Sequence, residues 1–198
     1  MIKIGLTGGI GSGKTTIAKI FEDYGIPVYY ADNRAKELMQ TNTALISKIK
    51  NLLGEEAYQE GKLNTKYIAD VVFNNKDKLL ALEQIVHPLV IQDFLQWVKR
   101  QNVEIVVIEN AILHKSGMNK WVDYIITVVS EDEIRRKRLL KRDKTTIEEI
   151  NKRIKNQDNQ GFLLKNSNFI IENNFSKKKL AQKVKEILRK VNFELKKS

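Results

Sequence analysis

Apolar residues occur in short, nearly continuous runs that alternate with longer stretches of helical spacing. The runs occupy 2–6, 28–31, 104–108, 124–129 and 168–171. Runs of this length are typical of strands buried in a parallel sheet. Apolar positions at helical spacing occupy 14–24, 33–100, 131–157 and 177–191. The alternation of strands and helices predicts an α/β fold with a parallel sheet.

Glycine and proline indicate where these helices end. Gly25 stands where a glycine commonly ends a helix. Within 33–100 we expect interruptions at Gly54, at Gly61 and at the pair His87-Pro88. The helix over 131–157 is expected to break near 143–145, and the spacing Thr146-x-x-Glu149 predicts a capping box at the start of its second half.

A glycine-rich segment follows the first predicted strand and opens the first predicted helix. It fits the pattern G-x-x-x-x-G-K-[ST] from Gly8 to Thr15. Such a loop directs backbone N–H groups at phosphate oxygens, and the helix N-terminus adds its dipole. Lys14 is expected to reach the β- and γ-phosphates, and the Thr15 hydroxyl to bind Mg²⁺. The predicted nucleotide-binding residues are Gly8, Gly9, Ile10, Gly11, Ser12, Gly13, Lys14, Thr15 and Thr16.

The remaining motifs favour a small-molecule kinase among the proteins that carry such a loop. A GTPase would have the sequence N-K-x-D after a strand, and the segments that begin at Asn75 and Asn119 both miss that spacing. Asp158 to Gly161 fits D-x-x-G but follows the charged helix, so we interpret this match as accidental. A chain of 198 residues also has no room for the accessory regions of large ATPase motors.

Two further groups of residues could act beside the loop. Asp32 ends the second predicted strand, where a carboxylate could orient an acceptor hydroxyl and accept its proton, or could cap the next helix. Arg138 and Arg142 are four positions apart and share one helix face, where they could neutralise charge on the transferring phosphoryl group as part of a lid. The alternative for this helix is a solvated surface whose cations pair with its own acidic residues.

Composition and charge narrow the class of protein further. Hydrophobic residues make up 42% and charged residues 30%, and there is no cysteine, which predicts a soluble, cytoplasmic protein with no disulfide and no membrane span. Residues 1–130 carry 15 basic and 14 acidic side chains, so most of the net charge of +11 lies later. Residues 176–198 carry nine basic and two acidic side chains on a predicted amphipathic helix. Few aromatic residues accompany these lysines, so we expect no nucleic-acid partner.

The assembled motifs resemble those of the dephospho-CoA kinase family over nearly the whole chain. The resemblance rests on these segments: Ile4-Gly-Leu-Thr-Gly-Gly-Ile-Gly-Ser-Gly-Lys-Thr-Thr16, Tyr24-Gly-Ile-Pro-Val28, Ala31-Asp32, Ile85-Val-His87-Pro88-Leu89, Arg138-Leu-Leu-Lys-Arg142-Asp143, Arg153-Ile-x-x-Gln157 and Ile171-Glu-Asn173-Asn174.

The resemblance implies a P-loop kinase with three parts. These are a nucleotide-binding core with a five-stranded parallel sheet (1–32, 101–130 and 161–198), a helical region that binds the acceptor (33–100), and a helical lid (131–160). The implied reaction is phosphorylation of the ribose 3′-hydroxyl of dephospho-CoA by ATP with Mg²⁺, the last step of CoA biosynthesis. The implied partners are therefore ATP and dephospho-CoA, with the protein a monomer or a weak homo-oligomer.

The resemblance also implies roles for single residues. Asp32 would act on the 3′-hydroxyl, Arg138 and Arg142 would be the lid arginines, and Asn173 and Asn174 would contact adenine. Taken without the resemblance, the two asparagines could equally form a turn after a strand. The acceptor would also meet Lys36 and His87, and Glu109 could help to hold Mg²⁺. The alternative for His87, a histidine before proline in an apolar stretch, is a structural role.

The sequence departs from the family in two places. Tyr30 replaces the first aspartate of an Asp-Ala-Asp run, and the segment 109–117 lacks a Pro-Leu-Leu sequence. Two other functions remain open: a P-loop kinase for another small acceptor, such as a nucleoside monophosphate or a sugar, and a non-enzymatic nucleotide-dependent switch.

Overall fold

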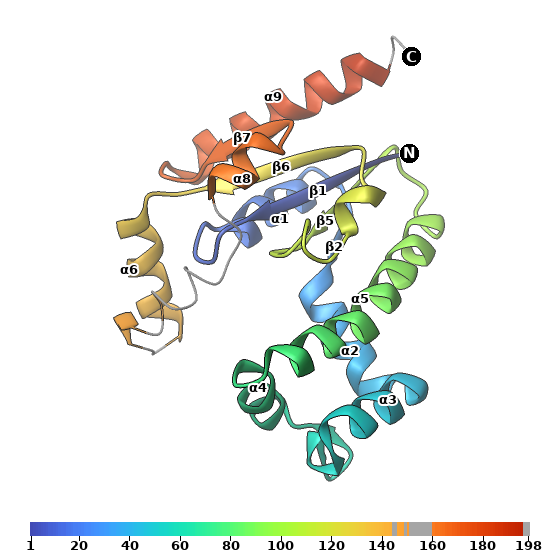
Figure 1. Cartoon of the computed structure of the whole chain (residues 1–198). Coiled ribbons are helices and arrows are strands. Elements are labelled where there is room, and N and C mark those ends of the chain that lie inside the picture. Colours follow the sequence, from blue (N-terminus) through green and yellow to red (C-terminus); the bar gives the residue numbers. More distant parts are fainter. Residues whose placement is uncertain (144–145, 149, 151–159, 196–198) are drawn as a thin grey trace. The chain divides into compact units, whose positions relative to one another are not determined.

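The five runs of apolar residues form one sheet in the computed structural model, which describes residues 1–143, 146–148, 150 and 160–195 (Figure 1). Its strands are β1 (Ile2–Gly8), β2 (Val28–Tyr30), β5 (Ile105–Glu109), β6 (Tyr124–Val129) and β7 (Phe169–Glu172). Their order in the sheet is β2-β5-β1-β6-β7. β1 pairs in parallel with β5 and with β6, and β6 pairs in parallel with β7. The predicted α/β fold is confirmed.

The chain divides into two compact units. One unit comprises residues 1–29 and 102–198, and the other comprises residues 30–101. The first unit contains most of the sheet, so we call it the sheet unit, and we call the second the helical unit.

The helices of the sheet unit are α1 (Lys14–Asp23), α6 (Asp132–Asp143), α8 (Gln160–Lys165) and α9 (Lys177–Leu195), with a 3-10 turn η2 (Met118–Trp121). α1 packs against β5 and α9, and α9 packs against β7, so these two helices lie together on the sheet (Figure 1). The central strand is completely buried at Ile4 and Leu6. Burial of such continuous apolar strands on both faces explains why their sequence shows no alternation.

Gly25 ends α1 as its position in the sequence predicts. It has a φ of 76°, which favours glycine. The Gly25 N–H donates to Glu22 O at 2.8 Å, and the Ile26 N–H donates to Phe21 O at 3.0 Å. This pair of bonds is a Schellman motif, which satisfies carbonyl groups at the end of the helix.

The helical unit comprises α2 (Ala31–Thr41), α3 (Thr43–Leu53), η1 (Glu55–Ala57), α4 (Thr65–Phe73) and α5 (Lys76–Lys99), with a hairpin of β3 (Tyr58–Gln59) and β4 (Lys62–Leu63). The long helix α5 packs against α2, α3 and α4. Arg34 of α2 and Asp93 of α5 form a bidentate ion pair, with N–O distances of 2.7 and 2.9 Å. This pairing raises the pKa of Arg34 further above its usual value.

One predicted interruption of this unit, at His87-Pro88, is wrong, whereas the predicted interruptions at Gly54 and Gly61 are confirmed. The helix α5 continues through His87-Pro88, and Pro88 is exposed, so water can bond the carbonyl group that proline leaves without a donor. The interruption at Gly61 is the turn of the hairpin β3–β4, which Gly61 forms together with Glu60. Both residues have positive φ, 50° for Glu60 and 73° for Gly61, as a two-residue hairpin turn requires.

Several predicted boundaries also differ from the structure. Ala31, predicted in a strand, is the first residue of α2. The helix α6 ends at Asp143, and the predicted continuation with Glu149, Arg153 and Gln157 lies outside the described residues. The helix α8 was not predicted, and α9 runs four residues beyond the predicted end at 191.

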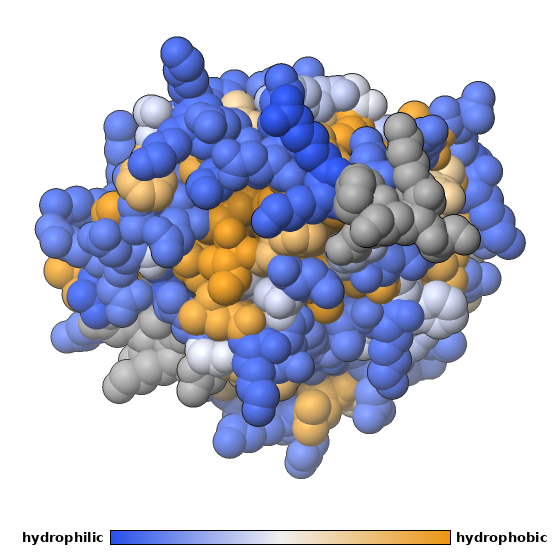
Figure 2. Space-filling model, turned by 90° about the horizontal axis from the view of Figure 1, so that it is seen from above, coloured by the Kyte–Doolittle hydropathy of each residue, from blue (hydrophilic) through white to orange (hydrophobic). Residues whose placement is uncertain are grey.

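The predicted amphipathic character of α9 is confirmed. Its apolar residues Leu180, Val184, Ile187 and Val191 are buried, whereas its lysines are exposed. Hydrophilic side chains predominate on the face of the molecule in Figure 2, with a smaller hydrophobic area among them. Among the described helices, none combines the length and the apolar character needed to cross a lipid bilayer.

Candidate active site

The glycine-rich loop connects the buried strand β1 to the helix α1. Gly8, Gly11 and Gly13 have φ values of 148°, 75° and 90°. A Cβ atom on Gly8 would lie 2.2 Å from Val128 O, and one on Gly13 would lie 2.0 Å from Asn173 Nδ2. These positions therefore require glycine both for backbone conformation and for space. The N-cap of α1, Gly13, makes no side-chain hydrogen bond, so no capping side chain occupies this end of the helix, where a phosphate group would bind.

Lys14 folds back over this loop. Its Nζ donates hydrogen bonds to the carbonyl oxygens of Gly8 at 2.9 Å and Gly9 at 3.4 Å. The ammonium group is therefore already held at the loop, where it can add positive charge beside a bound phosphate group. The structure brings together the residues of the predicted phosphate-binding motif as the sequence pattern requires.

The carbonyl groups on the outer side of the loop accept hydrogen bonds from distant residues. Arg135 Nε donates to Ile10 O at 3.0 Å. Arg138 Nη1 lies 3.4 Å from Gly11 O and 3.3 Å from Ser12 O. Three consecutive carbonyl groups of the loop are thus bonded to arginines of α6.

The asparagine pair after β7 lies at the same place. Asn173 is buried, and its side-chain Nδ2 donates to Ser12 O at 2.8 Å. The backbone carbonyl of Asn173 accepts from Arg138 Nη2 at 2.9 Å. Asn174 Oδ1 accepts from Ser130 Oγ at 2.8 Å and from the Glu131 N–H at 3.2 Å. The two asparagines therefore follow β7 directly and lie beside the loop, and the adenine contact that the resemblance implies stays a prediction.

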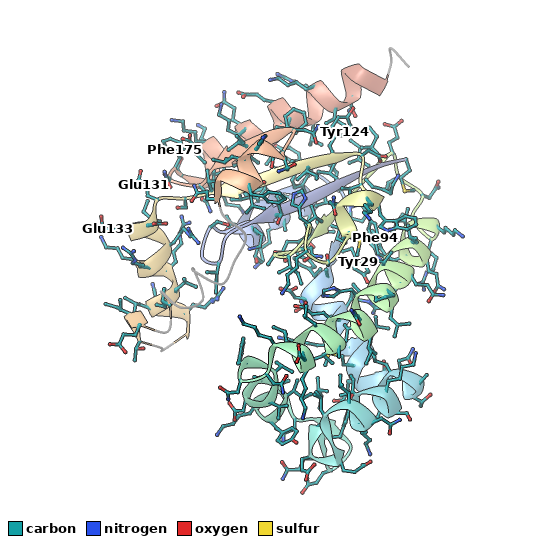
Figure 3. All side chains as sticks on the ribbon, viewed as in Figure 1. Tyr29, Phe94, Tyr124, Glu131, Glu133 and Phe175 are labelled. Atoms are coloured by element: carbon teal, nitrogen blue, oxygen red, sulfur yellow. The ribbon has the colours of Figure 1, made fainter. Side chains whose placement is uncertain are left out.

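The predicted lid helix has two different faces. Its outer face carries an exposed ion pair between Glu133 and Lys137 at 2.7 Å, and the side-chain hydrogen bond from Lys137 lowers the pKa of Glu133 (Figure 3). Its inner face carries Arg135 and Arg138, which contact the loop, and Arg142 is exposed near the end of the helix. The alternative interpretation, a solvated helix whose cations pair with its own acidic residues, therefore holds only for the outer face of α6.

Sequence reasoning did not select Arg135, although it is the most buried arginine of this group at 6% exposed. The signal was present in the spacing. Arg135, Arg138 and Arg142 follow at intervals of three and four residues, so one helix face presents all three. Leu139, which is buried on the same side, marks that face as the inner one.

The candidate metal ligands are two oxygen-bearing residues at the ends of neighbouring elements. Thr15 is exposed in the first turn of α1, and Glu109 ends β5 as the register partner of Leu6 in β1. Among the described residues, no group of three or more His, Cys, Asp or Glu side chains could hold a metal ion. This donor set fits Mg²⁺, which is commonly bound by one or two protein oxygens together with substrate phosphates.

The segment after Glu109, where the sequence departs from the family, folds around a buried asparagine. Asn110 Nδ2 donates to Ser116 Oγ at 3.1 Å, and its Oδ1 accepts from the Ile112 N–H at 2.9 Å. Leu113 is completely buried and lies against Gly5, where a Cβ atom would come within 2.8 Å of it. The segment therefore has its own internal bonds without the Pro-Leu-Leu sequence.

Three predicted acceptor-site residues belong to the helical unit. Asp32 is exposed in the first turn of α2, Lys36 is exposed one turn later, and His87 is half-buried in α5. The alternative prediction that Asp32 caps α2 is wrong, because Tyr30 is the N-cap residue and no side-chain hydrogen bond caps the helix there. As an acidic residue in the first turn, Asp32 instead interacts favourably with the helix dipole.

Comparison with known proteins agrees with this geometry. The family model described as dephospho-CoA kinase matches residues 2–179. A dephospho-CoA kinase of Porphyromonas gingivalis is 37% identical over 165 residues, which are 83% of this chain and 82% of the relative. The solved structure of TT1252 from Thermus thermophilus has a TM-score of 0.85 at 29% identity and covers 96% of this chain and 97% of its own.

The solved structure of dephospho-CoA kinase from Campylobacter jejuni also has the same fold. Its TM-score is 0.68 at 25% identity, over 96% of each chain. With a phosphate-binding loop between β1 and α1, a five-stranded parallel sheet and a family match that spans residues 2–179, the chain belongs to the dephospho-CoA kinase family.

Proposed function

We propose that this protein transfers the γ-phosphoryl group of ATP to the ribose 3′-hydroxyl of dephospho-CoA, which gives CoA and ADP in the last step of CoA biosynthesis. The observation that carries the proposal is the complete phosphate-binding loop, with Lys14 held at Gly8 O and Gly9 O, in a chain of this family. The reaction is an in-line displacement, in which positioning and electrostatic stabilisation supply most of the catalysis.

The donor side of the reaction lies in the sheet unit. Loop N–H groups and Lys14 bind the phosphates of ATP. Thr15 would hold Mg²⁺, with Glu109 as a second oxygen donor, and the ion would neutralise charge on the phosphate oxygens. The adenine would lie near Asn173 and Asn174, which support this assignment by their place next to the loop.

The acceptor side is assigned to the helical unit, residues 30–101. Asp32 would orient the 3′-hydroxyl and accept its proton as the new bond forms. Its exposure and its place directly after β2 support this role, because ligands of parallel sheets bind at the carboxyl ends of the strands. Lys36 and His87 would contact the remainder of dephospho-CoA.

We assign residues 131–160 to the lid. Arg138, which already lies at the loop, and Arg142 on the same helix face would neutralise charge as the phosphoryl group moves. Closure of a lid would also exclude water, which could otherwise accept the phosphoryl group.

We place the enzyme in the cytoplasm, as a monomer or a weak homo-oligomer whose partners are two small molecules. The basic α9 does not favour nucleic acid, because the nearby ring of Phe175 is covered by Lys179 Nζ at 3.8 Å (Figure 3). The ring face that the lysine occupies is not open to stacking on a base, which single-strand binders require. The lysines of α9 support long-range attraction of the two polyanionic substrates instead.

The proposal is tested by an ADP-release assay with Mg·ATP. Dephospho-CoA is compared with no acceptor, AMP, dCMP and shikimate, and the product is identified by mass. Release that depends on dephospho-CoA and yields CoA is the expected result. ADP release with another acceptor alone would contradict dephospho-CoA as the substrate. ATP binding without acceptor-dependent ADP release would favour a nucleotide-dependent switch.

A further inference from the structure

We propose that Arg135 is a positioning residue for the nucleotide phosphates. It holds the glycine-rich loop from its outer side, so that the loop N–H groups point at the phosphates. This inference rests on the proposed function only in requiring a nucleotide at the loop. It assigns a role to a residue that neither the motif nor the predicted lid arginines include.

The geometry of the peptide group couples each loop carbonyl to the N–H of the next residue. The carbonyl of one residue and the N–H of the next lie in one plane and point in opposite directions when the peptide is trans, as all described peptides are. The bond from Arg135 Nε to Ile10 O at 3.0 Å therefore fixes the direction of the Gly11 N–H. A loop carbonyl that is held outward leaves the next N–H directed inward.

The same arrangement continues along the loop. Arg138 Nη1 lies 3.4 Å from Gly11 O and 3.3 Å from Ser12 O, and Asn173 Nδ2 lies 2.8 Å from Ser12 O. The contacts at Ser12 O direct the Gly13 N–H in the same way, whereas the Ser12 N–H itself donates to Gly9 O at 3.1 Å within the loop. Three successive peptide groups are thus oriented from behind, and Arg135 holds the first of them.

Close packing keeps the Arg135 guanidinium in place. A Cβ atom on Gly9 would lie 2.6 Å from Arg135 Nη2, so the guanidinium fills the space that a side chain at position 9 would need. Asp132, one turn earlier in α6, accepts from Arg135 Nη1 at 3.0 Å. Leu139 packs on the next part of the loop, where a Cβ atom on Gly11 would lie 3.0 Å from its Cγ. The first turns of α6 therefore pack directly against the glycine-rich loop.

Charge adds to this positioning. Arg135 is 6% exposed, and its partner Asp132 has an exposed side chain whose charge is screened by water. The buried guanidinium consequently leaves positive potential behind the loop. Fixed positive charge and fixed N–H groups both favour the phosphates and need no reorganisation when the nucleotide binds.

The test compares Arg135→Gln and Arg135→Lys with Arg136→Gln, a matched control at the neighbouring exposed position of α6. Calorimetry measures the Kd values of ADP and AMP with Mg²⁺. The ratio of the AMP Kd to the ADP Kd isolates the contribution of the second phosphate. Loss of a charge-assisted bond should lower this ratio about tenfold in Arg135→Gln. Arg135→Lys should restore part of it, and Arg136→Gln should retain the wild-type value.

The calorimetric stoichiometry separates positioning from folding. A variant that only unfolds lowers the number of binding sites, whereas the Kd values of the folded fraction and their ratio stay unchanged. An unchanged ratio in Arg135→Gln, with ADP bound normally by the wild-type protein, would overturn the inference and leave the proposed function intact. Failure of the wild-type protein to bind ADP would instead overturn the proposed function, and the inference with it.

Discussion

Asn173 Nδ2 donates a hydrogen bond to Ser12 O at 2.8 Å, although 161 positions separate the two residues. The bond joins the segment after β7 to the loop after β1, and it leaves no room beside Gly13. A Cβ atom on Gly13 would meet the same Nδ2 atom at 2.0 Å. The place of the Asn173 side chain therefore depends on a glycine at position 13, within the motif.

We expect Gly13→Ala to damage the nucleotide site far more than Gly25→Ala does. Both glycines flank α1 and have positive φ, 90° and 76°. In the described chain, no heavy atom lies within 4 Å of a Cβ on Gly25, so that variant should lose only about 1 kcal/mol of unfolding free energy. Gly13→Ala must also displace Asn173, and should lower ADP affinity at least about tenfold. Urea denaturation and ADP titration measure the two effects, and equal effects of both variants would contradict the close packing.

Lys14→Ala should abolish turnover. Its Nζ bridges Gly8 O and Gly9 O, and its loss removes the cation at the phosphates, which we expect to lower kcat/KM by about 1000-fold or more. Lys19→Ala, at an exposed position of the same helix, is the matched control. Steady-state kinetics with ATP as the varied substrate measures both variants. Comparable turnover by the two would place the phosphates elsewhere.

Asp32→Asn should lower kcat about 100-fold or more while the Kd of ATP changes little, because the carboxylate is assigned to the acceptor hydroxyl. The amide retains the shape of the side chain but accepts a proton poorly. Asp70→Asn, an exposed position in α4 of the same unit, controls for the loss of a negative charge. Kinetics and ATP titration separate the two quantities. Normal turnover of the Asp32 variant would restrict this residue to its interaction with the α2 dipole.

Tyr58 should contribute to an alkaline loss of stability. Burial raises the pKa of its hydroxyl, which donates to Met39 O at 2.6 Å. Ionisation above about pH 10 is therefore easier in the unfolded chain than in the folded one, and the unfolding free energy falls as the pH rises toward the folded pKa. Tyr58→Phe should lose about 1 kcal/mol at pH 8 but show a smaller further loss by pH 11.

Urea denaturation between pH 8 and pH 11 measures this difference. Tyr67→Phe removes a similar bond, from a tyrosine hydroxyl to Leu53 O at 2.8 Å, and controls for the missing hydrogen bond. An alkaline loss in Tyr58→Phe as large as in the wild-type protein would exclude Tyr58 as its source.

The features that could be predicted from the sequence are those that local chemistry determines. β1, the loop and α1 follow from an apolar run, glycines at fixed spacing and Gly25, and α9 follows from its apolar face. Each depends on residues close together in the chain. The roles of all the predicted site residues in the reaction remain predictions, those of Lys14, Arg138 and Asn173 as much as those of Asp32, Arg142 and Asn174.

The features that could not be predicted depend on distant partners. Pro88 lies inside α5 because packing against three other helices stabilises that helix, and proline alone would have predicted an interruption. The direction of Arg135 depends on the loop carbonyl of Ile10, which lies 125 positions earlier. A charged residue on a helix does not by itself reveal whether it faces water or a backbone carbonyl.

The long separation between Ser12 and Asn173 also has a consequence for synthesis. The ribosome makes the loop well before it makes Ser130, Arg135, Arg138 and Asn173, which all bond to the loop or to one another. A growing chain thus carries the complete glycine-rich motif without the groups that hold its carbonyls. We therefore expect the loop to reach its full nucleotide affinity only after translation has passed β7.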